Sequence, residues 1–126
     1  MPASFRPRQR LRTRAEFDQV FRRGVRLDGA LFALIAVRNG RNEHRLGLVV
    51  SRRVGGAVAR NRARRLLRES FRRLPPVPDD ALDLVILVKA GLCARRQPEV
   101  EIELQQRLRR LARGSGPRGP RPAPRG

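Results

Sequence analysis

The side chains best suited to chemistry in this sequence are the arginines between Ser51 and Arg73. This stretch holds nine Arg and a single acid, Glu69. A guanidinium group is planar and offers paired N–H donors, so it fits the oxygens of a phosphate better than an ammonium group does. A row of like charges repels itself, and an anionic partner relieves that repulsion. The pattern therefore favours phosphate binding over the plainer alternative, a solvated charged helix face.

Positive charge extends over the whole chain of 126 residues, which predicts one domain with a modest core. Lys and Arg total 30 against 11 acids, giving a net charge of +19, and Lys89 is the only Lys. A bias in base composition would explain Arg in place of Lys, but it would not explain the excess of charge. Because the excess is present in the middle of the chain as well as at its ends, nucleic acid is the leading partner.

A helix from Ala57 to Leu74 must present the arginine row. Its apolar residues fall on one face at the helical period: Ala59, Ala63, Leu66, Leu67, Phe71 and Leu74. Most of the arginines lie outside that face, and Arg60 lies at its edge. Gly55 and Gly56 allow a sharp turn before the helix, and Pro75 cannot continue it.

A shorter helix and two strands are expected before this segment. Thr13 and Glu16 have the spacing of a capping box, and Gly24 is a plausible helix end. The apolar runs 31–37 and 46–50 predict strands, which we expect to pair as a hairpin through an Asn-Gly turn. Residues 25–27 suggest an additional short edge strand.

The remaining pattern completes an α+β fold. Residues 82–88 predict a buried strand parallel to 46–50, because a helix separates the two. Gln97-Pro98-Glu99 opens a last helix. The expected order is αβββαβα, or αββαβα without the edge strand, with a small mixed sheet packed against helices.

Other candidate reactive groups carry less weight. Cys93 and His44 are the only Cys and His, so the two cannot form a four-ligand zinc site, and we expect His44 to be exposed. Asp79, Asp80 and Asp83 could resemble nuclease carboxylates, but they follow a proline-rich turn and fit a loop before a strand. No metal site, secretory signal or membrane-spanning segment is expected, and the single Cys fits a cytoplasmic protein.

Three functional classes fit these observations. A DNA-binding regulator would need a helix-turn-helix partner or a dimer seam, and neither is visible. A structural RNA-binding protein, such as a ribosomal component, shares the charge and the fold type. The third class is an accessory subunit of a ribonucleoprotein endonuclease.

Three segments favour the third class by resemblance. Arg60-Asn61-Arg62, together with the residues up to Glu69, resembles the signature helix of the bacterial ribonuclease P protein component. The preceding stretch 47–58 resembles the strand and loop of the same family. The spacing Phe17-x-x-Val20-Phe21-x-x-Gly24 resembles its first helix. The similarity runs from about residue 10 to about residue 111.

The resemblance implies a fold like domain 2 of ribosomal protein S5, αβββαβα, with a left-handed crossover that general rules would not predict. It also implies endonucleolytic removal of the 5′ leader from precursor tRNA. The chemistry would belong to the catalytic RNA subunit and its Mg²⁺, so no residue of this chain would be catalytic or bind metal. The partners would be that RNA and precursor tRNA, with no DNA and no membrane.

Site residues carry over by position. The residues matching the RNA-binding segment are Arg52, Arg53, Arg60, Asn61, Arg62, Arg64, Arg65 and Arg68. Phe17 and Phe21 match aromatics that line a leader-binding cleft, and Phe32 is a further match on the sheet. Ile35 stands where the family has an aromatic on the binding face, so we expect that stacking contact to be weaker or to be supplied differently. The domain would span 1–112, with a basic arm at 1–12 and a flexible basic tail at 113–126.

Overall fold

The computed structural model describes residues 9–41, 43–74 and 81–112. The elements along the chain are α1 (Arg14–Arg23), β1 (Val25–Asp28), β2 (Phe32–Arg38), β3 (Arg45–Val49), α2 (Ala57–Arg72), β4 (Leu82–Val88) and α3 (Gln97–Ala112). Two short 3-10 turns are η2 (Arg52–Val54), before α2, and η3 (Leu92–Ala94), after β4. The predicted α+β order αβββαβα is confirmed. Most of the predicted basic arm and all of the tail lie outside the described residues, as do Asp79 and Asp80.

The strand order in the sheet is β1-β2-β4-β3. β4 runs antiparallel to β2 and parallel to β3, which confirms the predicted parallel pair. The predicted hairpin between the second and third strands is wrong, because β4 lies between them. The connection from Arg38 to Arg45 is long enough to pass the end of β4. It is tied there by the Asn39 side-chain amide, which donates to an Asp83 carboxylate oxygen at 2.9 Å.

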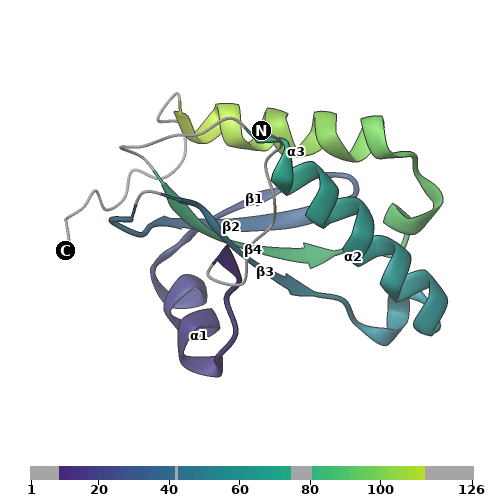
Figure 1. Cartoon of the computed structure of the whole chain (residues 1–126), viewed down its shortest axis with the longest axis horizontal. Helices are drawn as coiled ribbons and strands as arrows, with labels where there is room; N and C mark the ends of the chain where they lie inside the picture. Colours follow the sequence, from purple (N-terminus) through teal and green to yellow (C-terminus); the bar gives the residue numbers. More distant parts are fainter. Residues whose placement is uncertain (1–8, 42, 75–80, 113–126) are drawn as a thin grey trace.

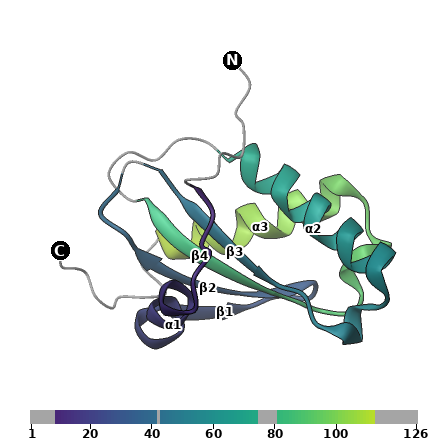
Figure 2. The ribbon, with the colours of Figure 1, turned by 60° about the horizontal axis from the view of Figure 1, so that its bottom comes forward.

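The helices cover both faces of the sheet. α2 and α3 lie together on one face, and α1 lies on the other (Figures 1 and 2). The larger apolar cluster fills the space beneath α2 and α3 and includes Phe32, Leu67 and Leu104. A smaller cluster lies beneath α1. On this face α1 packs against β2 and β4.

The first helix begins and ends as predicted. The Thr13 hydroxyl accepts from the Glu16 N–H, and the Glu16 carboxylate accepts from the Thr13 N–H, both at 3.1 Å. The Gly24 N–H closes the last turn on the Val20 carbonyl at 2.8 Å. Before the helix, Leu11 donates its N–H to Leu46 at 2.9 Å, so the entering chain lies along β3. Among the described residues, no helix is both long and apolar enough to cross a membrane.

Candidate RNA interface

A tight turn delivers two arginines to the start of α2. The Ser51 hydroxyl accepts from the Arg53 N–H at 3.3 Å and begins η2. Gly55 then adopts a φ of 139°, and a Cβ on it would lie 2.8 Å from the Ala59 Cβ. Glycine is therefore needed to turn the chain into α2. Arg52 and Arg53 are exposed on the outside of this turn.

One line of the α2 surface gathers positive charge. Arg60, Arg64 and Arg68 are spaced by four residues and therefore follow one edge of the helix. Partial burial lowers the pKa of Arg68, and the neighbouring charges of Arg10 and Arg64 lower it further. Arg10 enters this group because its backbone bridges to Leu46 of β3. Positive charges close enough to disfavour one another indicate a surface suited to an anion.

Two further residues of the predicted RNA-binding segment, Asn61 and Arg65, lie on the outermost side of α2. Asn61 and Arg65 are exposed, and the Asn61 side-chain oxygen accepts from the Arg64 guanidinium at 3.1 Å. This contact holds Arg64 across the helix surface without neutralising it. The structure thus brings Arg52, Arg53, Asn61, Arg64, Arg65 and Arg68 onto the outside of η2 and α2.

The opposite edge of α2 faces α3, and its arginines contact the protein itself. Arg73 pairs with Glu101 at 2.9 Å. The Arg62 Nε donates to the Cys93 carbonyl at 2.7 Å, and a second Arg62 nitrogen donates to the Arg95 carbonyl at 3.0 Å. Sequence periodicity placed Arg62 with the other arginines but could not show that its donors are engaged by carbonyls.

Aromatic residues lie on the α1 face. Phe17 is half-buried against the smaller apolar cluster, and its ring lies over Gly47 of β3. A Cβ on Gly47 would lie 2.6 Å from the Phe17 Cζ, so glycine leaves room for the ring. Phe21, one turn further along α1, is 45% exposed. An exposed ring beside a half-buried one can stack an unpaired base.

The two sheet residues predicted on this face behave differently. Phe32 is fully buried beneath α2 and α3, so its assignment to a leader-binding cleft is wrong. Side chains alternate between the faces of a strand, which places Phe32 opposite Ile35. Ile35 does lie on the α1 face, but α1 covers it and it is 5% exposed. An uninterrupted apolar run gave no alternation from which to separate the two faces.

A buried ion pair, which the sequence did not suggest, anchors α1. Arg45 makes two hydrogen bonds to the Asp83 carboxylate, at 2.9 and 2.8 Å, and a third to Glu16 at 3.2 Å. The Asp83 hydrogen bonds raise the pKa of Arg45. Glu16 is the third residue of α1 and completes its capping box, and the hydrogen bonds it accepts from the backbone of Arg12 and Thr13 lower its pKa. The network therefore fixes the start of α1 to the sheet.

This network also bears on the carboxylates that could resemble a nuclease site. Asp83 is buried and bound to Arg45, and Asp79 and Asp80 lie outside the described residues. Within the described parts of the chain, no three His, Cys, Asp or Glu side chains group as metal ligands. His44 is half-buried and its Nδ1 accepts from the Leu82 N–H at 3.0 Å, so the expectation that it is exposed is wrong.

Known proteins resemble this chain in both sequence and fold. The Ribonuclease P family model matches residues 5–112. The ribonuclease P protein component of Thermotoga maritima is 38% identical over 73% of this chain and 79% of its own. That of Pseudoalteromonas translucida is 34% identical over 91% of this chain and 82% of its own. The solved RNase P protein from Thermotoga maritima has a TM-score of 0.69 at 32% identity, covering 80% of this chain and 96% of that one. The chain therefore belongs to the ribonuclease P protein component family, which works within the ribonucleoprotein that removes the 5′ leader from precursor tRNA.

Proposed function

We propose that the outer surface of η2 and α2 binds the catalytic RNA subunit of ribonuclease P through its phosphates. The contacting residues would be Arg52, Arg53, Arg60, Asn61, Arg64, Arg65 and Arg68. The observation that carries the proposal is the grouping of exposed or half-exposed guanidinium groups along one side of α2, where neighbouring charges lower the pKa of Arg68. Such a surface repels itself until phosphates neutralise it.

Salt dependence of RNA binding tests this surface. Removing one arginine that neutralises a phosphate should reduce the slope of log K against log salt by about 0.7–0.9 of a unit. We expect that reduction for Arg65→Met. The matched control is Arg73→Met at the C-cap of the same helix, because Arg73 pairs with Glu101 and faces α3. A slope that Arg65→Met leaves unchanged, or that the control reduces equally, contradicts the assignment.

We further propose that Phe17 and Phe21 contact the 5′ leader of precursor tRNA. The exposure of Phe21 and the position of both rings on the α1 face support this role. Stacking tolerates any base, which suits a leader of variable sequence. Phe21→Leu should weaken the binding of precursor tRNA by the holoenzyme and leave mature tRNA unaffected. Ile102→Ala is the matched control, since Ile102 is 54% exposed on α3, across the sheet.

The hydrolysis itself we assign to the RNA subunit and its Mg²⁺, with no metal bound by this chain alone. In support, the carboxylate of Asp83 is bound by Arg45 and is not available to a metal ion. The partners we propose are the catalytic RNA and precursor tRNA. We also propose a cytoplasmic location, which accords with a single cysteine that cannot form an internal disulfide.

A further inference from the structure

The Arg62 side chain of α2 hydrogen-bonds the turn from β4 into α3, residues Gly91–Arg96. The two donors of Arg62 reach the carbonyls of Cys93 and Arg95, at 2.7 and 3.0 Å. Leu92 is fully buried at the base of the turn. Because carbonyls at alternate positions accept from a single planar group, the contact fixes the path of the turn as well as its distance from α2.

Lysine cannot fill both donor positions at once. A lysine at this position keeps the charge, but its ammonium is a single point on a flexible stem and cannot reproduce a planar fork that reaches two carbonyls. The Nε of Arg62 is one of the two donating atoms. Arg62 could act on RNA through its charge or position the turn through its hydrogen bonds. Arg62→Lys separates these two roles, because it retains the charge and removes the fixed contact.

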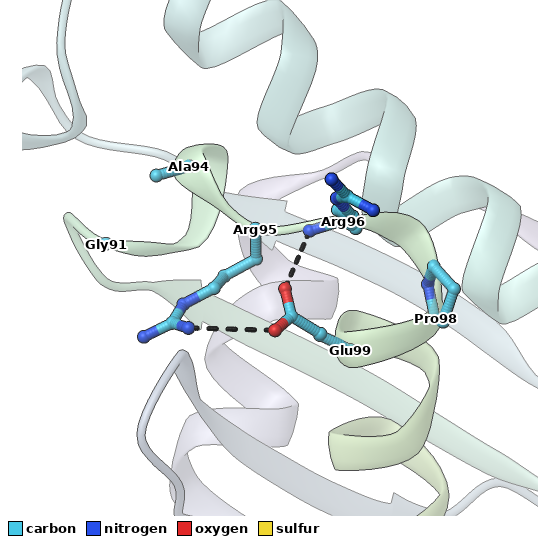
Figure 3. A pocket seen from close by; sticks show the side chains of 6 residues that line it. All are labelled: Gly91, Ala94, Arg95, Arg96, Pro98 and Glu99. Atoms are coloured by element: carbon cyan, nitrogen blue, oxygen red, sulfur yellow. Dashed lines mark hydrogen bonds and ion pairs between the residues drawn. The ribbon is translucent and has the colours of Figure 1, made fainter.

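The turn carries two exposed arginines of its own, Arg95 and Arg96. They line a hollow of about 690 Å³ with Gly91, Ala94, Pro98 and Glu99 (Figure 3). Arg95 points toward Glu99 at 3.7 Å, whereas the side chain of Arg96 has no hydrogen-bond or ion-pair partner within the described residues. Its backbone N–H donates to Glu99 at 2.9 Å, which fixes the main chain at the point where Arg96 projects.

The turn also contacts η2. The Cys93 thiol lies 4.0 Å from the Val54 carbonyl, as a weak donor to it. η2 carries Arg52 and Arg53, which belong to the proposed RNA surface. The two arginine-bearing turns are thus neighbours, and both are fixed to α2. Two adjacent cationic turns are complementary to the closely spaced phosphates of one RNA backbone.

We propose that Arg62 is a positioning residue, which holds the Gly91–Arg96 turn so that Arg96 contacts the same RNA as η2 and α2. The proposal rests on the proposed function and gives Arg62 a different role from the RNA contact that the family resemblance implied. Arg62 does not itself contact a phosphate. By holding the Gly91–Arg96 turn, Arg62 adds that turn, which lies outside the signature helix, to the RNA surface of this protein.

Two readouts test this, one without RNA and one with it. Cys93 is the only cysteine, so its labelling rate by a disulfide reagent in the free, full-length protein reports opening of the turn. Losing one hydrogen bond of Arg62 should raise that rate about fivefold. The second readout is the salt slope of binding to the catalytic RNA. The variants are Arg62→Lys, Arg96→Met and their combination, with Arg73→Lys and Arg65→Met as controls.

The proposal expects Arg62→Lys to speed labelling and to reduce the slope by about 0.7–0.9 of a unit, although the charge is retained. Arg96→Met should reduce the slope equally at a normal labelling rate, and the double variant should reduce it no further. Arg73→Lys should leave both readouts unchanged, because Arg73 pairs with Glu101 and faces α3.

Three results overturn the proposal. Normal labelling and a normal slope for Arg62→Lys would show that a positive charge at this position is enough and that the two hydrogen bonds are not required. Faster labelling with a normal slope would make the contact merely structural. An unchanged slope for Arg96→Met would remove the turn from the RNA surface. Failure of the proposed function is distinguishable, because then Arg65→Met would not reduce the slope, whatever the labelling of Cys93 shows.

Discussion

Gly47→Ala is expected to disturb the leader-binding face without altering any charge. Gly47 is buried in β3, and a Cβ there would lie 2.6 Å from the Cζ and 2.7 Å from the Cε2 of Phe17. It would also lie 3.2 Å from the Cβ of Leu11. Both neighbours are packed in the cluster beneath α1, so the ring must move away from the sheet to admit the methyl group.

The cost has two parts. Overpacking of this kind lowers the free energy of unfolding by about 1–3 kcal/mol. A displaced ring also loses its stacking on a leader base, which is worth about 1–3 kcal/mol. That range corresponds to precursor tRNA binding about 5- to 150-fold weaker. Phe17→Leu removes the two ring atoms nearest to the new methyl, so the double variant should recover stability while leader binding stays weak.

The assay compares the affinities of the assembled holoenzyme for precursor and mature tRNA, with urea unfolding of the free protein alongside. The salt slope of binding to the catalytic RNA serves as the control and should be unchanged, because Gly47 lies on the sheet face opposite to α2. Equal losses for precursor and mature tRNA would refute the reasoning. So would a Gly47→Ala variant with normal stability, since the ring would then move without cost.

Three further perturbations have expected results. Arg45→Met leaves the Asp83 carboxylate buried without its cation and should lower the free energy of unfolding by about 3–5 kcal/mol, measured in urea; a loss below about 1 kcal/mol would contradict the anchoring role. Burial lowers the pKa of His44, whose Nδ1 accepts from Leu82, so the unfolded chain takes up this proton first as pH falls. Unfolding free energy should therefore fall as pH drops below about 6.5, and His44→Gln should flatten that dependence. Thr13→Ala removes a helix cap and should cost about 1 kcal/mol in thermal unfolding, where an unchanged midpoint would count against the cap.

Local signals in the sequence predicted the elements well. The Thr13 and Glu16 spacing, the helical period from Ala57 and the glycine at Gly24 each depend on neighbours within one or two turns. The parallel pairing of β3 and β4 followed from the intervening helix. Helical periodicity also depends only on near neighbours, so it was enough to separate the exposed side of α2 from its buried side. The hand of the β3–α2–β4 crossover stays a prediction.

The features that the sequence could not predict depend on contacts between segments that are far apart in the chain. The Asn-Gly turn at Gly40 is real, with a φ of 69°, but β4 enters from a distant segment and separates the strands that the turn was expected to join. Phe32 and Ile35 could not be assigned to faces in a run that is apolar throughout. Arg62 matches the signature by position, yet its partners lie 31 and 33 residues away. Periodicity carries no information about such partners.

The most direct test of the account is leader cleavage on labelled precursor tRNA at low Mg²⁺, with the cognate catalytic RNA alone, the protein alone and the two together. We expect little cleavage by either component alone and a sharp rise when the protein joins the RNA. We also expect a smaller rise with Phe21→Leu, because the target of Phe21 is the leader. Cleavage by the protein alone, or no stimulation of the RNA, would contradict the role of this chain as the RNA-binding subunit of ribonuclease P.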